Sequence, residues 1–517
     1  GHTLWYKSTM LSLIRLIPAP LRYLTLLWLT SSSVLASQPN LVIFYVDDLG
    51  YGDLGSYGHQ IVTTPNIDRL AADGVKFTQY YAPAPLCSPS RAGLLTGRTP
   101  YRTGVRSWIP DGQNIHLGAN EITLAHLLKQ KGYATAVMGK LHLNGGADMQ
   151  DHPQAIDLGF DYSFVIPGGW AKNKKLETVP TDGSRRHGKL YPDNYWRNGV
   201  PVSETNKFSA ELVADEVLHW LAQHNAHHKE GSAPFFLYVP FSEVHTPIAS
   251  PAEYLDQYSQ YITSEGKSQP DLYHWDWNDR PYRGQGEYYA NISFLDAQIG
   301  RIIKKLEVMR QLDNTIIFFA SDNGPVTREA RKPWELNMAG ETGGLRGRKD
   351  NLLEGGIRVP GILRYGNSIK PDIEVSQAVT GLDILPTLAD LMNFDIPNDR
   401  EIDGQSILPI LSGDKFLRHK PLIWSIDMPG QDDPINEWAI RVGEWKMILD
   451  REENPKFLFN IEGDPYEMFN KLDHPEQKTV QADLLEAFHT YLHSIGTDSI
   501  KSFRQETLNI NRRRLRK

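Results

Sequence analysis

The stretch Asn40-Leu-Val-Ile-Phe-Tyr-Val46 is a continuous apolar run that leads directly into Asp47-Asp48 and a glycine-rich segment. A run of this length and composition is typical of a buried parallel strand. In open α/β sheets, functional side chains gather beyond the carboxyl ends of such strands. The two aspartates after Val46 therefore mark both a strand end and a candidate site.

Similar arrangements recur along the chain. Apolar runs at 314–320, 133–138 and 234–239 lead to Ser321-Asp322-Asn323, to Gly139-Lys140-Leu141-His142 and toward His245. Helical patterns at 122–131, 209–224 and 288–306 separate the runs. Strands that alternate with helices predict an α/β fold, with a large mixed, mostly parallel sheet covered by helices on both faces.

The pattern changes after about residue 400. Short strands are predicted at 421–426, 438–442, 445–449 and 456–461, with a tight hairpin at Gly443-Glu444 and a helix at 481–495. We therefore expect a large α/β domain at 37–400 and a small C-terminal subdomain at 401–500, in which a helix packs on an antiparallel sheet. A basic tail would follow at 501–517.

Composition and the first residues restrict the class of protein. The net charge of −8 over 517 residues argues against a nucleic-acid binder. From Met10 the sequence has the pattern of a signal peptide that ends at Val34-Leu35-Ala36, which predicts a leader at 1–36. Its apolar stretch is too short to cross a membrane. We expect an exported protein, periplasmic or secreted and typical of bacteria, without a stable membrane anchor.

Cys87 is the only cysteine, and it lies in the string Cys87-Ser-Pro-Ser-Arg91-Ala-Gly-Leu-Leu-Thr-Gly-Arg98. A lone cysteine forms no intramolecular disulfide, so it is either a small buried hydrophobe or a residue kept for its own chemistry. Ser88 is a candidate N-cap of a helix, and Pro89 suits the first turn. Arg91 would then lie near the positive end of the helix dipole, where anions are favoured.

The whole string resembles the signature of the type I sulfatases of the alkaline phosphatase superfamily, and the resemblance extends over residues 38–475. A protein tyrosine phosphatase loop matches poorly, because only three residues separate Cys87 from Arg91. The resemblance implies a catalytic domain at 37–400. It also implies that a formylglycine-generating maturation enzyme oxidises Cys87 to Cα-formylglycine, whose hydrate is the nucleophile. Arg91 would bind this nucleophile and the metal-ligand carboxylates.

Four oxygen-bearing side chains follow two of the predicted strands: Asp47, Asp48, Asp322 and Asn323. Carboxylates and an amide without histidine suit Ca²⁺ or Mg²⁺, although each aspartate could instead cap a turn. The resemblance implies that these residues, with residue 87, hold one divalent cation, Ca²⁺ in preference to Mg²⁺.

Lys140 and His142 are two residues apart at a strand end, where alternate side chains point the same way. The resemblance implies that Lys140 contacts sulfate and that His142 acts as the base that expels it. Leu141 stands where the family usually has tryptophan, a change expected to affect packing more than chemistry.

Two further residues complete the expected site. The resemblance places His245 against the sulfate and the leaving oxygen, where it would stabilise or protonate the departing group. Lys349, five residues before Glu354, matches the second sulfate-binding lysine, with Arg346 and Arg348 close by as alternatives.

We therefore predict a sulfuric ester hydrolase that removes sulfate from a sulfated polysaccharide or oligosaccharide. Basic residues between 172 and 189 and aromatic side chains would suit such a substrate, or they could be solvated charges and local packing. The aromatic side chains are Trp170, Trp196, Tyr273, Trp275 and Trp277. The alternatives are a phosphate or phosphonate monoester hydrolase of the same superfamily and a non-catalytic protein that binds sulfated glycans.

Overall fold

The computed structural model describes residues 38–146, 149, 151–166, 168–171, 184–185, 192–202, 205–227, 233–246, 248–261, 275–276, 284–326, 339–427 and 437–496. The predicted leader and basic tail, most of the basic stretch 172–189, Tyr273 and Trp277 lie outside these residues. Among the helices that are described, none is both long and apolar enough to span a bilayer. All the described helices and strands lie in the compact unit that begins at Asn40.

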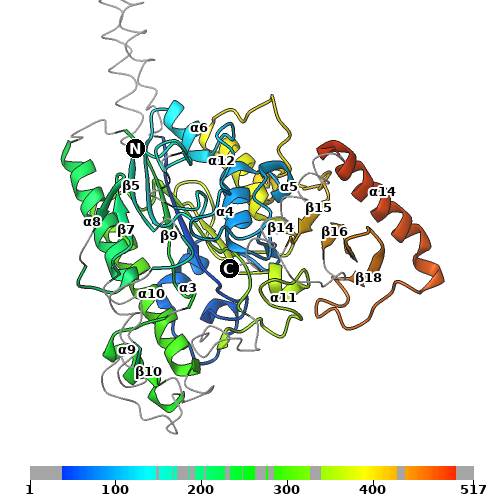
Figure 1. Cartoon of the computed structure of the whole chain (residues 1–517), viewed down its shortest axis with the longest axis horizontal. Coiled ribbons are helices and arrows are strands. Elements are labelled where there is room, and N and C mark those ends of the chain that lie inside the picture. Colours follow the sequence, from blue (N-terminus) through cyan, green and yellow to red (C-terminus); the bar gives the residue numbers. More distant parts are fainter. Residues whose placement is uncertain are drawn as a thin grey trace, which may run out of the picture. The chain divides into compact units, whose positions relative to one another are not determined.

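The predicted α/β sheet is confirmed (Figure 1). Within the described residues, its ten strands follow the order β13-β2-β12-β11-β1-β9-β4-β5-β7-β8. The five central strands are parallel to one another: β11 (Thr315–Ser321), β1 (Asn40–Val46), β9 (Phe235–Pro240), β4 (Ala134–Lys140) and β5 (Tyr162–Ile166). Antiparallel pairing occurs toward both edges, at β12 (Gly361–Arg364), β2 (Val75–Phe77), β7 (Tyr195–Arg197) and β8 (Val200–Val202), whereas β13 (Ile373–Val375) runs parallel to β2. The sheet is thus mixed, with a parallel centre.

The central position of β1 explains its continuous apolar run. All seven of its residues are buried, and the strand pairs with β11 on one side and β9 on the other. Val42, Phe44 and Val46 belong to one hydrophobic core, whereas Leu41 and Ile43 belong to the core on the opposite face. A strand buried on both faces has no position for a polar side chain until it ends.

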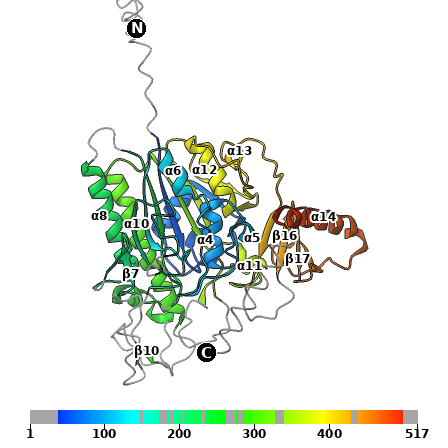
Figure 2. The ribbon, with the colours of Figure 1, turned by 45° about the horizontal axis from the view of Figure 1, so that its top comes forward.

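Helices cover the two faces of the sheet (Figure 2). One face packs against α3 (Pro65–Ala72), α8 (Ser209–His227) and α10 (Gly284–Val308). The other packs against α4 (Cys87–Thr96), α6 (Leu124–Gln130) and α12 (Ile384–Met392). The predicted helices are therefore confirmed, and α10 begins four residues before its predicted start.

Shorter elements connect these layers. They are η2 (Gly55–Tyr57), β3 (Tyr80–Tyr81), α5 (Pro100–Thr103), β6 (Ser184–Arg185), α9 (Ala252–Gln257), η3 (Ser259–Tyr261), β10 (Trp275–Asp276), α11 (Glu354–Ile357), β14 (Val379–Thr380), η5 (Gly381–Asp383), α13 (Leu408–Leu411) and η6 (Pro475–Gln477). Two pairs form small separate ladders, β6 with β10 and β3 with β14.

The predicted C-terminal sheet and helix are also confirmed. The antiparallel strands β15 (Leu422–Ser425), β16 (Trp438–Val442), β17 (Trp445–Leu449) and β18 (Pro455–Asn460) pair in sequence order. Gly443, with φ of 58°, makes the tight hairpin between β16 and β17 possible. One face of this sheet packs on α14 (Lys478–Ile495). The other face packs against Tyr81, Leu86 and Ile357, which belong to the α/β part of the chain.

Candidate active site

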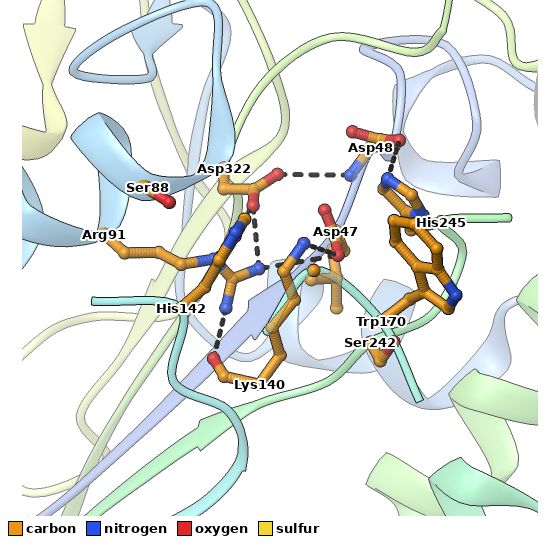
Figure 3. Close-up of polar contacts among 12 residues, drawn as sticks. Asp47, Asp48, Ser88, Arg91, Lys140, His142, Trp170, Ser242, His245 and Asp322 are labelled. Carbon is orange, nitrogen blue, oxygen red and sulfur yellow. Dashed lines mark hydrogen bonds and ion pairs between the residues drawn. The ribbon is translucent and has the colours of Figure 1, made fainter. Parts of the chain in front are cut away.

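The parallel centre of the sheet brings the predicted site residues together. Asp47 and Asp48 follow β1, Asp322 follows β11, Lys140 ends β4, and the segment after β9 carries His245. Because parallel strands present their carboxyl ends at one edge, residues far apart in sequence converge there (Figure 3).

Three aspartates and an asparagine form the acidic part of this site. Asp48 adopts φ of 63°, a left-handed conformation that aspartate tolerates, and its backbone N–H donates to Oδ1 of Asp322 at 3.1 Å. Nδ2 of Asn323 donates to Oδ1 of Asp48 at 2.7 Å. These residues and Asp47 are completely buried, so their charges require compensation inside the protein.

Three cations provide that compensation. From α4, Arg91 donates through Nε and Nη2 to Oδ2 of Asp322 at 3.1 and 2.7 Å, and through Nη1 to the Lys140 carbonyl at 2.7 Å. Lys140 Nζ lies 2.5 Å from Oδ2 of Asp47, and Lys349 Nζ lies 2.6 Å from Oδ1 of Asp48. The two lysines therefore contact the two aspartates that follow β1.

The charges act unequally on the three carboxyl groups. Burial alone would raise the pKa of Asp47 and Asp48, but Lys140 and Lys349, respectively, lower it below its ordinary value. Burial and the nearby charge of Asp47 raise the pKa of Asp322 to about 7, although Arg91 opposes this. A cation among these oxygens would reverse that last shift, because it would favour the ionised carboxylate.

Several atoms fit a divalent metal ion. Ligand atoms of Asp47, Cys87 and Asp322 lie within 4.8 Å of one another, and all three residues are buried. Oδ1 of Asp47 and Oδ1 of Asn323 are buried and have no hydrogen-bond partner among the described residues. Buried oxygens without donors are uncommon, and carboxylate and amide oxygens are ligands of hard cations. The site therefore has the composition of a Ca²⁺ or Mg²⁺ site.

Cys87 is the first residue of α4 and is buried. The predicted N-cap at Ser88 is wrong: Leu86 precedes the helix, and Ser88 lies within the first turn. There its Oγ accepts a hydrogen bond from the Ile109 N–H at 3.1 Å. Burial raises the pKa of the Cys87 thiol despite the nearby charge of Lys140, so the unmodified residue is not a ready thiolate.

His142 reaches the site by a different route from the one predicted. The strand ends at Lys140, and His142 has φ of 52°, so strand alternation does not orient it. Gly139 permits the close packing before this turn, because a Cβ there would lie 1.9 Å from the Pro240 carbonyl oxygen.

The protonation of His142 follows from its contacts. Its Nε2 lies 2.8 Å from the carbonyl oxygen of Ile109, which can only accept a hydrogen bond, so Nε2 carries the proton. Its Nδ1 is buried and has no partner within the described part of the chain. Burial and the charges of Lys140 and Arg91 hold the pKa of His142 well below its usual value. The ring is therefore neutral, with a lone pair on Nδ1.

His245 lies at the outer side of the site. Its Nδ1 donates to the Thr246 carbonyl, and its Nε2 lies 3.7 Å from Oδ2 of Asp48. Burial lowers the pKa of His245 to about 4, against the opposing charge of Asp48. The side chain is 17% exposed, compared with 11% for Lys349 and 0% for Lys140. His245 and Lys349 therefore lie on the solvent-exposed side of the site.

Sequence reasoning missed three contributors. The carbonyls of Ile109 and Thr246 orient the two histidines, and no residue pattern reports a backbone contact of this kind. Asp53 is buried and accepts hydrogen bonds from the Gly50 N–H, the Tyr288 hydroxyl and the Glu341 N–H at 2.6–2.7 Å, which shapes the loop after β1. The only signal for Asp53 was its place in the glycine-rich segment that follows Asp48.

The fold and these residues place a buried cluster of carboxylates and cations at the carboxyl edge of an α/β sheet. A sequence model of the sulfatase family matches residues 39–394, and a model of the C-terminal part of N-sulphoglucosamine sulphohydrolase matches residues 346–493. The chain therefore belongs to the sulfatase family, of the alkaline phosphatase superfamily, and is a sulfuric ester hydrolase, as its sequence predicts.

Curated relatives agree with this assignment. The chain is 31% identical to N-acetylgalactosamine-6-O-sulfatase of Bacteroides thetaiotaomicron, over 88% of this chain and 94% of that one. It is 30% identical to bovine arylsulfatase A, over 92% and 93% of the two chains. Human steryl-sulfatase is 31% identical over 77% of this chain and 74% of its own.

Solved structures have the same fold. Ps i-CgsB, in complex with k-i-k-neocarrahexaose, superposes with a TM-score of 0.71 at 24% identity, over 88% of this chain and 93% of that one. A sulfatase structure from work on glycosaminoglycan metabolism by Bacteroides thetaiotaomicron superposes with a TM-score of 0.65 at 28% identity, over 88% and 99%.

Proposed function

We propose that this sulfatase removes sulfate from a sulfated oligosaccharide or polysaccharide. The reaction would use Cα-formylglycine at position 87 and one Ca²⁺ ion. The observation that carries the proposal is the buried convergence of Cys87 with Asp47 and Asp322, beside two oxygens that have no hydrogen-bond partner among the described residues. The carbohydrate substrate is supported by a relative aligned over most of both chains, which is named for N-acetylgalactosamine 6-sulfate hydrolysis.

Asp47, Asp48, Asp322 and Asn323 would hold the cation. When present, the cation would polarise sulfate oxygens and formylglycine would supply the nucleophilic hydroxyl. Ca²⁺ suits the site better than Mg²⁺ because it accepts several carboxylate oxygens in an irregular arrangement, whereas Mg²⁺ usually keeps water ligands. Arg91 would keep Asp322 ionised and oriented by donating to its Oδ2 through two nitrogens.

Lys140 and Lys349 would neutralise the sulfate. Both ammonium groups now lie on carboxylate oxygens, at 2.5 and 2.6 Å, and both point into the cluster. A metal ion on those carboxylates would release the ammonium groups to the anionic substrate. Cations placed in a buried site stabilise developing charge more strongly than they would in water.

The two histidines would handle protons at separate positions. Nδ1 of His142 has its lone pair available inside the site, so this atom would accept the proton that must leave when sulfate is expelled. Nε2 of His245 lies 3.7 Å from Oδ2 of Asp48 on a partly exposed side chain, where it would meet the leaving oxygen. An anionic ester beside this ring would raise the pKa of His245 and favour the form that donates.

We also propose the remaining context of the reaction. A formylglycine-generating enzyme would act on Cys87, and the leader pattern at 1–36 supports export to the periplasm or outside the cell. Catalysis would belong to residues 37–400, with 401–500 as a subdomain. The match to the sulfatase model, which ends at residue 394, supports this division.

The test is sulfate release by protein matured beside a formylglycine-generating enzyme. Wild-type protein should hydrolyse 4-nitrophenyl sulfate and at least one sulfated saccharide, and Cys87→Ala should lose turnover while retaining the circular dichroism spectrum of the wild type. Wild-type-like activity in Cys87→Ala would refute the nucleophile assignment.

The same assay separates the two alternatives. Faster hydrolysis of 4-nitrophenyl phosphate or a phosphonate ester than of any sulfate ester would identify a phosphate or phosphonate hydrolase. Binding of sulfated saccharides by the matured protein without sulfate release would identify a non-catalytic glycan-binding protein.

A further inference from the structure

Trp170 lies at the same sheet edge as the site. It follows β5, whose last residue, Ile166, pairs with Lys140. The Trp170 carbonyl accepts a hydrogen bond from Nδ2 of Asn194 at 3.0 Å, and the next N–H, of Ala171, donates to Oγ of Ser242 at 3.5 Å. Backbone contacts on both sides therefore hold this residue near the segment that carries His245.

The indole of Trp170 stacks on the imidazole of His245 (Figure 3). The ring centroids are 5.9 Å apart and the planes differ by 10°. The imidazole is also held through Nδ1, which donates to the Thr246 carbonyl. The stacked indole adds to the restraint on rotation about Cβ–Cγ of His245, because turning the imidazole would break the parallel, offset ring contact.

The exposed fractions of the site residues indicate on which side of the site the group attached to the sulfate would lie. Asp47, Lys140 and Arg91 are completely buried, whereas His245 and Lys349 are partly exposed and Trp170 is half-buried. A sulfate group held near Cys87 would therefore have its ester oxygen and the attached group on the partly exposed side, where His245 and Lys349 lie. That group would lie next to the indole.

We propose that Trp170 is a positioning and specificity-determining residue of this sulfatase. Its indole holds the His245 imidazole in the plane from which Nε2 reaches the leaving oxygen, and it forms the apolar wall against which the sulfate-bearing ring rests. The proposal rests on the proposed function, because it assigns a leaving group to the His245 side. An aromatic wall suits the apolar face of a sugar or aryl ring.

The experiment compares phenyl sulfate with 4-nitrophenyl sulfate, whose leaving group is more acidic and depends less on help from His245. In Trp170→Ala, KM should rise for both substrates, because both lose the wall. The kcat value should fall about tenfold for phenyl sulfate and little for 4-nitrophenyl sulfate, since a stacking contact of this kind corresponds to about a factor of ten at most. Trp170→Phe retains a ring and should restore the wild-type ratio of the two kcat values.

Trp445→Ala, which removes a half-buried indole from β17 of the small sheet, is the matched control and should leave the ratio unchanged. Equal losses of kcat on both substrates in Trp170→Ala, or a Trp170→Phe variant as impaired as Trp170→Ala, would overturn the proposal. If Trp170→Ala does not fold, the Trp170→Phe ratio alone decides: a wild-type ratio supports the role of the ring, and an altered one overturns it. Absence of turnover in matured wild-type protein would instead refute the proposed function.

Discussion

Two buried charge clusters in this protein use the same kinds of side chain but differ in whether all of their oxygens accept hydrogen bonds. The site cluster consists of Asp47, Asp48, Asp322, Asn323, Lys140, Lys349 and Arg91. The Glu354 cluster consists of Glu354, Glu467, Lys446, Tyr81 and Arg441. Comparing the partners of their carboxylate and amide oxygens distinguishes a cluster that binds something from one that holds the fold together.

Every carboxylate oxygen of the Glu354 cluster accepts a hydrogen bond. Lys446 Nζ donates to Glu354 at 2.9 Å and to Glu467 at 2.8 Å, the Tyr81 hydroxyl donates to the second oxygen of Glu354 at 2.6 Å, and the Glu354 N–H donates to the second oxygen of Glu467 at 2.7 Å. In the site cluster, Oδ1 of Asp47 and Oδ1 of Asn323 have no such donor among the residues described. We infer that the Glu354 cluster is structural and that the site cluster binds a ligand.

The Glu354 cluster also helps to position Lys349 of the site cluster. Lys446 belongs to β17 of the small sheet, and Glu354 begins α11. The next N–H, of Gly355, donates to the Arg346 carbonyl at 2.7 Å, within the loop that carries Lys349. The Lys349 N–H in turn donates to the Pro325 carbonyl at 2.8 Å. These backbone contacts link the small sheet to the position of Lys349, but the two clusters should respond differently to substitution.

The largest expected effect on stability is at Lys446. Lys446→Ala leaves two buried carboxylates without their shared cation and should lower the free energy of unfolding by about 3–5 kcal/mol. Turnover per folded molecule should change much less. Urea denaturation and active-site-normalised kinetics measure the two quantities. Lys456→Ala is the control, since it removes a partly exposed ion pair to Asp450 and should cost less than about 1 kcal/mol. Equal stability losses in both variants would remove the distinction between the clusters.

Among the cations of the site cluster, the largest expected effect on catalysis is at Lys140. Lys140→Ala should lower kcat by about 10²–10³-fold in the presence of calcium, because a preorganised contact to the sulfate charge is lost. Steady-state hydrolysis of 4-nitrophenyl sulfate provides the measurement. Lys129→Ala, which breaks an exposed ion pair between α6 and Asp161, should retain wild-type kcat. A Lys140→Ala enzyme whose kcat stays close to that of the wild type would exclude Lys140 from the catalytic machinery.

Calcium should distinguish the clusters by ligand binding. Protein treated with a chelator and then given calcium at about 100 times its Kd should gain about 2.7 kcal/mol in unfolding free energy. Asp322→Asn should lose this gain, whereas Glu467→Gln should keep it, because Glu467 lies in the Glu354 cluster. Denaturation with and without calcium tests this, and an unchanged gain in Asp322→Asn would show that the ion binds elsewhere.

The smallest effect is a pH dependence from Glu467. Burial, reinforced by Glu354 and opposed by Lys446, raises the pKa of Glu467 from 4.5 to about 7. The folded protein therefore binds the Glu467 proton more tightly than the unfolded chain does. Protonation of Glu467 thus adds to the free energy of unfolding. This contribution is complete below about pH 4.5 and is lost as pH rises through 7. The slope cannot exceed one proton, about 1.4 kcal/mol per pH unit. Glu467→Gln should flatten the stability profile between about pH 5 and 7, relative to a Glu486→Gln control on α14, and an unchanged slope would contradict the shift.

The sequence predicted the centre of the fold well because buried parallel strands carry a strong apolar signal. The predicted strand at 40–46 coincides with β1, and the polar residues after it lie where parallel strand ends meet. The strands β2, β12 and β13 have only three or four residues each and were not predicted, since so short a run has no clear period.

Within the candidate site, side-chain identities were predictable and their orientation was not. The motifs identified Cys87, Arg91 and His142, but the carbonyl of Ile109 that determines the His142 tautomer belongs to a loop 33 residues away with no recognisable pattern. The predicted orientation of His142 by strand alternation was wrong because the chain leaves the sheet after Lys140. Such contacts depend on tertiary packing, which local sequence does not encode.

The central claim, a formylglycine nucleophile at position 87, is tested most directly by a peptide mass spectrum across Cys87, using protein matured beside a formylglycine-generating enzyme. We expect the mass of Cα-formylglycine or its hydrate at this position in the fraction that hydrolyses sulfate esters. Unmodified cysteine throughout a fraction that is fully active on sulfate esters would contradict the claim.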